Sequence, residues 1–82
     1  MPELEIYKEL TEVFRSVFDE DEIVIGPQTT AADIPGWDSA IHLQLILATE
    51  MHFNLRFRTA EFESLKNVGD FVALIQGKLA KR

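Results

Sequence analysis

The sequence contains no cysteine. This absence excludes disulfide bonds, zinc sites built on thiolates and a cysteine nucleophile. The chain also has no apolar run near the roughly 20 residues that a bilayer-spanning helix needs, so we expect no membrane span. Its first ten residues are acidic and lack the basic region of a secretory signal. We therefore expect a soluble, cytoplasmic protein.

Basic residues are scarce: 8 Lys and Arg stand against 14 Asp and Glu, for a net charge of −6. A nucleic-acid-binding domain presents a basic face, so we expect no nucleic-acid partner. The charge is uneven. Residues 1–38 hold ten acids and two basic residues, a balance of −8, whereas residues 39–82 hold four acids and six basic residues, a balance of +2. The acidic half suits either a basic partner or simple solvation.

With 82 residues, of which 46% are hydrophobic, the chain predicts a single folded domain over residues 1–82. So short a chain has no room for a catalytic cleft between two domains. No strand pattern, internal repeat or low-complexity tract is present, and we expect a monomer.

The first predicted helix spans residues 3–18. Pro2 suits its first turn, where the acids Glu3 and Glu5 face the positive end of the helix dipole. The acidic run at 19–22 ends it. Its apolar stripe, at helical spacing, is Ile6, Leu10, Val13, Phe14 and Val17.

Two further long helices are predicted. One runs from Ser39 to Phe53, with Asp38 as its N-cap and Asn54 as a left-handed residue after its end. The other begins after the cap residue Asn67, with Asp70 three residues on. Its apolar stripe is Val68, Phe71, Leu74, Ile75 and Leu79, and the basic residues at its negative end are Lys78, Lys81 and Arg82.

Residues 23–37 have no helical period and are predicted to be a loop. We expect its apolar residues to pin it to the core; they are Ile23, Ile25, Ile34 and Trp37. A short helix is predicted within residues 59–65, with Thr59 as its cap. The fold class is therefore all-α: a small antiparallel four-helix bundle of three main helices and one short helix.

The predicted helix from Ser39 to Phe53 carries two apolar stripes. One falls within an arc of about 100° and is the expected core face; its members are His42, Leu45, Ile46, Thr49 and Phe53. The other is Leu43, Leu47 and Met51, rimmed by Gln44 and Glu50. A thin bundle does not easily bury both, so the second stripe is expected to be a docking surface unless another segment covers it.

Ser39 lies at the first turn of this helix. As a nucleophile it would need a base and an orienting third group within reach. Its neighbour Asp38 points away from it, His42 falls toward the core arc, and no glycine-rich elbow surrounds the serine. We therefore expect neither a Ser–His catalytic site nor an enzyme. His42 and His52 project differently, so no metal site is expected.

The start of a helix is, however, well placed for a phosphate ester on a serine, because free N–H groups and the dipole favour negative charge there. A serine merely tolerated at that position is the alternative.

Residues 29–57, together with the Asn-Val-Gly-Asp start of the last helix, resemble the acyl carrier proteins, the phosphopantetheine-binding domain family. The resemblance covers essentially the whole chain. The family signature is Asp-Ser-Leu at the start of helix II, followed by an aliphatic helix that ends in Glu-x-x-Phe. Here the matching residues are Asp38-Ser39-Ala40 and Glu50 to Phe53.

By this resemblance, Ser39 is the attachment site of 4′-phosphopantetheine, with Asp38 as the adjacent motif residue. A phosphopantetheinyl transferase would donate the arm from coenzyme A, using a metal ion. The arm's thiol would hold an acyl group as a thioester, so the protein itself needs no cysteine. The implied partners are this transferase and acyl-loading or acyl-transferring enzymes of fatty acid, lipid or polyketide biosynthesis. An aminoacyl or peptidyl cargo, or a module that is never modified, remains as an alternative.

Two departures from the family pattern indicate a specialised carrier. Ala40 replaces the leucine that helps partner enzymes grip the site. The family usually displays several acids at the outward positions of the helix that corresponds to residues 39–53. Here only one of these positions holds an acid; the residues are Ile41, Gln44, Glu50 and Met51. We therefore expect partners to dock on the stripe of Leu43, Leu47 and Met51. The acids nearest the site are Asp33 and Asp38, and Trp37 is expected to pack the end of the loop.

Overall fold

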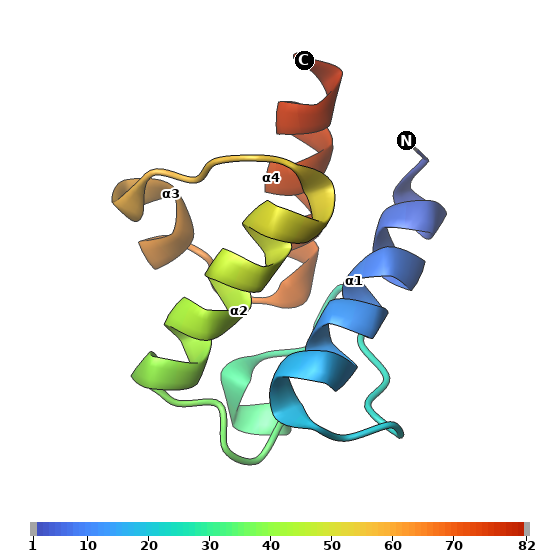
Figure 1. The fold of residues 1–82 in the computed structure, drawn as a ribbon, viewed down its shortest axis with the longest axis vertical. Coiled ribbons are helices and arrows are strands. Elements are labelled where there is room, and N and C mark those ends of the chain that lie inside the picture. Colours follow the sequence, from blue (N-terminus) through green and yellow to red (C-terminus); the bar gives the residue numbers. More distant parts are fainter. Residues whose placement is uncertain (1, 82) are drawn as a thin grey trace.

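The computed structural model describes residues 2–81, which form a small helical bundle (Figure 1). Its α-helices are α1 (Glu3–Phe18), α2 (Ser39–Phe53), α3 (Thr59–Glu63) and α4 (Val68–Ala80). α1 runs in one direction along the bundle, and α2 and α4 return in the other. The predicted all-α bundle of three long helices and one short helix is thus confirmed. The prediction for Arg82 lies outside the described residues.

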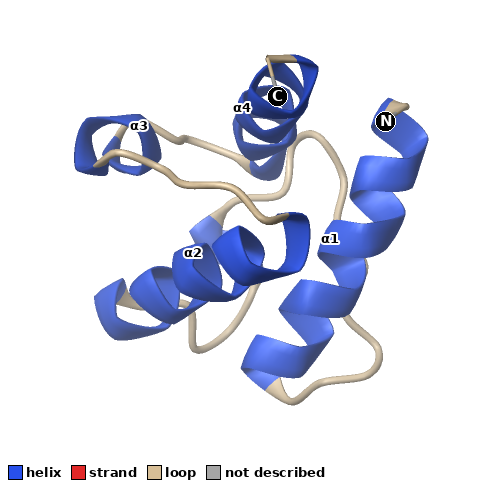
Figure 2. Cartoon of the chain, turned by 45° about the horizontal axis from the view of Figure 1, so that its top comes forward, coloured by secondary structure: helices blue, strands red, loops and turns tan. Residues whose placement is uncertain are grey.

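The short helix α3 stands on the side of the bundle away from α1, with a loop on either side of it (Figure 2). Across residues 2–81, no helix combines the length and the apolar character needed to cross a bilayer.

The predicted caps of α2 and α4 are confirmed. The Asp38 carboxylate accepts a hydrogen bond from the Ile41 N–H at 2.9 Å, and Asn67 Oδ1 accepts one from the Asp70 N–H at 2.8 Å. Each bond satisfies one of the N–H groups that the first turn of a helix leaves unpaired. Asn54 ends α2 in the left-handed conformation, with φ at 57°.

The predicted cap of α3 is wrong. Thr59 is the first residue of that helix, and Arg58 occupies the cap position. Glu61 Oε1 accepts a hydrogen bond from the Arg58 N–H at 2.7 Å. A glutamate at this third helical position reaches back over the first turn, so the Thr59 hydroxyl is not needed as a cap.

One apolar core joins the three long helices and the loops. Ile6, Leu10 and Phe14 of α1 are fully buried in it. The predicted core face of α2 is confirmed for its buried members, which are Leu45, Ile46, Thr49 and Phe53. The Thr49 hydroxyl donates to the Leu45 carbonyl oxygen at 2.7 Å, so a polar group is accommodated in the core without losing its hydrogen bond. His42 is only half-buried.

The predicted core stripe of α4 is confirmed at Val68, Phe71 and Ile75, which are buried, and it differs at two neighbouring positions. Val72 is buried, whereas Leu74 is only half-buried. At 100° per residue, the buried residues of α4 lie within an arc of about 100°, and Leu74 lies roughly 110° from the centre of that arc. The face of α4 that packs into the core is therefore narrower than the predicted stripe. It consists of Val68, Phe71, Val72 and Ile75.

The long loop between α1 and α2 is anchored as predicted. Ile34 is buried, and Ile23, Ile25 and Trp37 are half-buried against the core. The loop also contains a turn of 3₁₀ helix that was not predicted, at Ala31–Asp33.

The same loop binds the start of α4. The Val68 N–H donates to the Thr29 carbonyl at 2.8 Å, and the Gly69 N–H donates to the Pro27 carbonyl at 3.0 Å. Two N–H groups of the first turn of α4 are therefore satisfied by the loop backbone. The approach is close: a Cβ atom on Gly69 would lie 2.7 Å from the Pro27 carbonyl oxygen.

We expect Gly69→Ala to destabilise the fold by about 1–3 kcal/mol, because the added methyl group forces the loop backbone away from α4. Gly77→Ala is the matched control in the same helix, since a Cβ there meets no atom within 4 Å. It should stabilise the protein by up to about 1 kcal/mol through helix propensity. Thermal unfolding of both variants measures the difference, and a Gly69→Ala protein as stable as Gly77→Ala would contradict the close approach.

A second prediction concerns the core face of α4. Phe71→Ala should lower the free energy of unfolding by about 3–5 kcal/mol, because it removes a buried ring and leaves a cavity. Leu74→Ala on the same helix should have a clearly smaller effect, since that side chain is already half in water. Urea denaturation measures both, and equal losses would show that the buried face is wrongly placed.

Candidate functional site

Ser39 is the first residue of α2, and its side chain is exposed. The chain reaches it through a tight turn in which the Trp37 N–H donates to the Ile34 carbonyl at 3.3 Å. Gly36 takes a φ of 85° in this turn, a left-handed conformation that glycine adopts without strain. The Asp38 carboxylate is engaged with the Ile41 N–H. The local structure thus presents the Ser39 hydroxyl at the surface, at the positive end of a helix of 15 residues.

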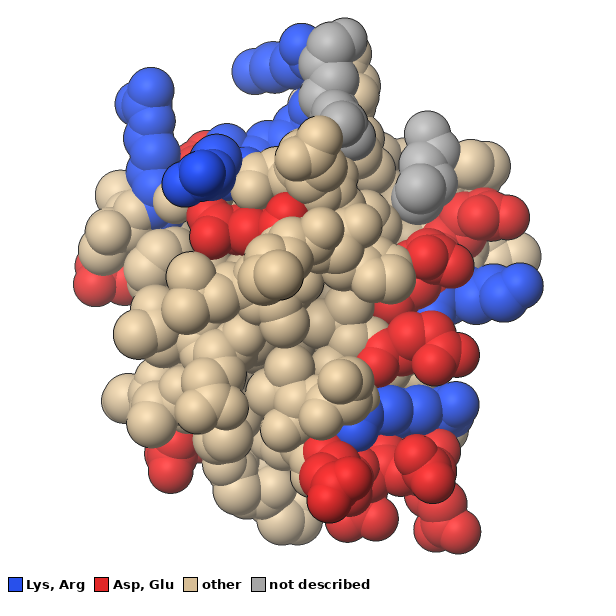
Figure 3. Space-filling view, viewed as in Figure 1, with Lys and Arg blue, Asp and Glu red and all other residues tan. Residues whose placement is uncertain are grey.

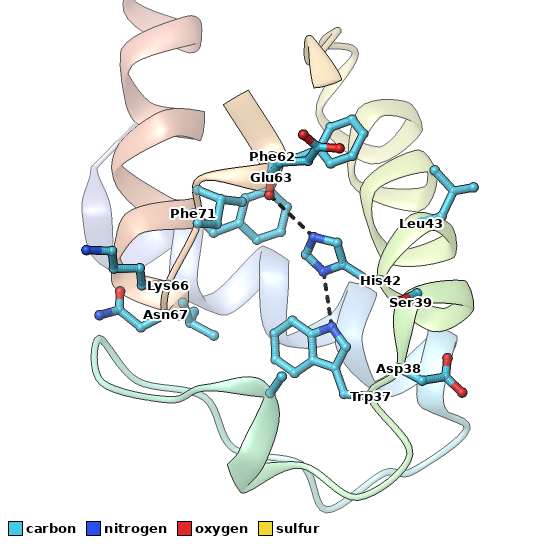
Figure 4. Close-up of a pocket in the computed structure, with 13 residues that line it drawn as sticks. Trp37, Asp38, Ser39, His42, Leu43, Phe62, Glu63, Lys66, Asn67 and Phe71 are labelled. Atoms are coloured by element: carbon cyan, nitrogen blue, oxygen red, sulfur yellow. Dashed lines mark hydrogen bonds between the residues drawn. The ribbon is translucent and has the colours of Figure 1, made fainter. Parts of the chain in front are cut away.

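A cavity of about 510 Å³ opens beside Ser39, between α2, α3 and the start of α4 (Figure 4). Ser39 and Asp38 border it on the side of α2. Its walls are largely rings and aliphatic side chains, among them Trp37, His42, Leu43, Phe62, Leu65 and Phe71.

Trp37 forms the end of the loop and connects it to two helices. Its indole packs edge-on against Phe14 and Phe18 of α1, with ring centroids 5.4 and 6.0 Å away. On its other side it stacks with His42 of α2, at 6.0 Å and an interplanar angle of 25°. The expectation that Trp37 packs the loop end is confirmed.

Both ring nitrogens of His42 are engaged. Trp37 Nε1–H donates to His42 Nδ1 at 3.1 Å, and His42 Nε2 lies 3.4 Å from the carbonyl oxygen of Phe62. An indole N–H is only a donor, so His42 Nδ1 must be the acceptor. The proton of the neutral imidazole then lies on Nε2 and points at Phe62 (Figure 4).

This geometry leaves Ser39 without the activation that a nucleophile needs. His42 is turned toward Trp37 and Phe62, and the Asp38 carboxylate caps α2 instead of orienting an imidazole. Within the described range 2–81, no group of three or more His, Cys, Asp or Glu side chains is placed to hold a metal ion.

The second apolar stripe of α2 is exposed. Leu43, Leu47 and Met51 have 50%, 51% and 85% of their surface accessible, so neither α3 nor the loops cover them. Ala40 and Gln44 are exposed on the same helix. Figure 3 shows a broad face without charge in the middle of the molecule, with acidic residues gathered at its lower right and basic residues at its top.

Three acids that the sequence placed at the site or on the docking surface have structural contacts: Asp33, Asp38 and Glu50. Besides the cap at Asp38, Asp33 Oδ2 accepts from the Thr30 N–H at 2.9 Å, and Glu50 Oε2 accepts from the Phe57 N–H at 2.7 Å. Sequence reasoning placed Glu50 at the outer rim of α2, but its side chain is half-buried and holds the following loop. The sequence feature that indicates this contact is Asn54. Its left-handed conformation ends α2 and turns the following loop back toward Glu50.

A salt bridge connects α3 to α4. Lys78 Nζ lies 2.9 Å from Glu61 Oε1. The hydrogen bond from the Arg58 N–H, together with Lys78, lowers the pKa of Glu61 below its usual value, so the carboxylate stays ionised at neutral pH. On the opposite side of the bundle, His52 Nε2 lies 2.8 Å from Glu9 Oε1 and joins α2 to α1.

The chain is similar to known proteins at the level of solved structures. Neither a protein-family model nor a curated protein matches the sequence. Among solved structures, the chain is similar to the solution NMR structure of a holo acyl carrier protein from Geobacter metallireducens. The two are 45% identical with a TM-score of 0.86, over 92% of this chain and 86% of the other.

The chain belongs to the acyl carrier protein family. The resemblance drawn from the Asp38-Ser39 motif is thereby confirmed, as is the fold. Acyl carrier proteins are carriers and not catalysts, which agrees with the engagement of both His42 nitrogens away from Ser39.

Proposed function

We propose that this protein carries acyl groups on a 4′-phosphopantetheine arm attached to the Ser39 hydroxyl. The observation that carries the proposal is an exposed serine at the start of α2, beside an open apolar cavity, in a chain of the acyl carrier protein family. The similar protein from Geobacter metallireducens is described as a holo acyl carrier protein, which supports an attached arm here as well.

The residues around Ser39 fit such an arm. Its phosphate would be bound at the N-terminus of α2, where unpaired N–H groups and the helix dipole favour negative charge. Asp38 already uses its carboxylate as the cap, so it fixes the first turn and with it the direction of the Ser39 side chain. When bound, the arm supplies a terminal thiol that holds the acyl group as a thioester. The arm would come from coenzyme A through a phosphopantetheinyl transferase.

The cavity favours an acyl cargo over an aminoacyl one. Its walls are rings and aliphatic side chains, which gain when apolar cargo replaces water. The two carboxylates that border the cavity, Asp38 and Glu63, are exposed to water, so they would compensate an ammonium group only weakly for its lost hydration. We therefore propose fatty acid, lipid or polyketide-type biosynthesis as the setting. Because coenzyme A donates the arm, we place the protein in the cytoplasm.

We further propose that partner enzymes dock on the stripe of Leu43, Leu47 and Met51. The stripe lies on the helix that carries Ser39, and all three side chains are exposed. Ala40 and Gln44 extend this surface, and Asp33, Asp38 and Glu50 are its nearest acids. The shortage of acids on α2 supports a specialised carrier whose partners rely on apolar contact.

Ser39→Ala should abolish modification by a phosphopantetheinyl transferase while leaving the thermal unfolding midpoint nearly unchanged, because an exposed hydroxyl contributes little to stability. Intact-mass spectrometry after incubation with the transferase and coenzyme A measures the modification. Ser16→Ala is the matched control, since that exposed serine of α1 should leave the mass gain intact. Modification that persists in Ser39→Ala refutes the site, and an unmodified wild-type protein favours a module that acts only by binding.

Leu47→Ser should weaken the binding of a cognate acyl-handling enzyme about tenfold or more, because a buried aliphatic side chain contributes about 1.5–3 kcal/mol. Glu63→Gln is the control for charge, since Glu63 is an exposed acid and Glu50 is tied to the backbone. Titrations at low and high salt add a second test, because exposed charges are screened within roughly 8 Å at physiological ionic strength. A large loss of affinity with salt, and none on Leu47→Ser, would show that charge and not apolar contact drives docking.

A further inference from the structure

Of the elements that form the cavity, α3 is attached least firmly to the rest of the protein. This helix has five residues, and none of them is buried. So short a helix is not stable by itself, and its position depends on contacts with the rest of the protein. Two polar contacts hold it. Glu61 pairs with Lys78 of α4, and the Phe62 carbonyl accepts from His42 on the cavity side.

On the side away from α3, His42 is held in place by Trp37. Its ring stacks on Trp37 and accepts the indole N–H, and Trp37 packs against Phe14. Phe14 is fully buried in the core. A continuous series of contacts therefore runs from the core, through Trp37 and His42, to the backbone of α3.

Of the two hydrogen bonds in this series, the one from His42 to Phe62 is the longer. The Trp37–His42 hydrogen bond measures 3.1 Å, within the ordinary range for such bonds, whereas the distance from His42 to the Phe62 oxygen is 3.4 Å. Hydrogen bonds weaken as they lengthen, so α3 separates from His42 more easily than His42 separates from Trp37.

We propose that His42 is a positioning residue that holds α3 against α2 through the Phe62 carbonyl, and so limits the size of the acyl group that the cavity shelters. This inference rests on the proposed function. His42, Phe62 and Ser39 all line the same cavity (Figure 4). A short acyl group fits beside His42 with α3 in place. A longer or bulkier group requires α3 to move outward, and the His42–Phe62 contact opposes that movement.

His42→Phe separates the hydrogen bonds from the ring packing. Phenylalanine keeps a ring between Trp37 and Phe62 but has no nitrogen, so both hydrogen bonds are lost. The matched control is His52→Phe, which makes the same substitution on the same helix but at its far end, where the histidine contacts Glu9.

Hydrogen exchange of the unmodified full chain is the first test. In His42→Phe, the amides of residues 59–63 should exchange roughly threefold to tenfold faster than in wild type, as expected for one lost hydrogen bond. Exchange within α1 should not change, and His52→Phe should leave α3 as protected as in wild type. Unchanged exchange in α3 overturns the proposal.

The second test measures size selection directly. The Ser39 of each protein is first modified with 4′-phosphopantetheine, whose thiol then carries straight-chain acyl groups of increasing length, and the rate of thioester hydrolysis is followed. His42→Phe should protect longer chains than wild type and His52→Phe do, and an unchanged length profile overturns the size limit even if α3 exchanges faster. A merely structural role would alter stability without shifting this profile.

The two tests also separate this inference from the proposed function. If Ser39 of the wild-type chain accepts no arm, the proposed function fails, and with it the size limit; the exchange measurement still decides whether His42 holds α3. If circular dichroism shows that His42→Phe does not fold, Trp37→Phe replaces it. That variant removes the indole donor and should shift both readouts in the same direction by a smaller amount.

Discussion

The packing of Trp37 between α1 and α2 is the contact on which the site depends. Its indole lies edge-on against the buried Phe14 and donates its N–H to His42. Aromatic pairs of this kind add roughly 0.5–1.5 kcal/mol beyond the burial of their surface. The pair therefore fixes where the loop ends and where α2 begins. Ser39 follows directly after this junction and the Asp38 cap, and His42 extends the junction to the Phe62 carbonyl of α3, which the Glu61–Lys78 pair also holds.

Acidic residues have two roles in this protein. On α1 and in the segment after it, they form an exposed negative surface (Figure 3). Around the site, Asp33, Asp38 and Glu50 instead accept backbone N–H groups and define local structure. The apolar stripe of Leu43, Leu47 and Met51 on α2 is exposed. The helix that carries Ser39 thus exposes an uncharged stripe, although Asp38 beside Ser39 is exposed and the chain as a whole is strongly acidic.

Much of the fold could be predicted from the sequence because periodicity and capping are local properties. The bounds of α1 and α2 follow from the apolar spacing and from Asp38 and Asn54. The edge of the buried face of α4 could not be predicted, since Val72 and Leu74 are both apolar and only contact with the other elements distinguishes them.

The same limit applies to the site. The Asp38-Ser39 pair identified the candidate serine, but the cavity beside it could not be predicted. It is formed by α2, α3 and the start of α4, which are separate in sequence. The link from His42 to Phe62 spans 20 residues and has no local pattern.

Trp37 is the chain's only tryptophan, and it lines the cavity beside Ser39. The fluorescence of the protein therefore originates almost entirely from one ring at the place where cargo would reside. Indole emission shifts to shorter wavelength when water leaves its surroundings, and the hydrogen bond to His42 makes it sensitive to movement of that side chain as well. The molecule thus carries its own optical probe at the wall of the cavity, and a molecule that entered the cavity would change its emission without any added label.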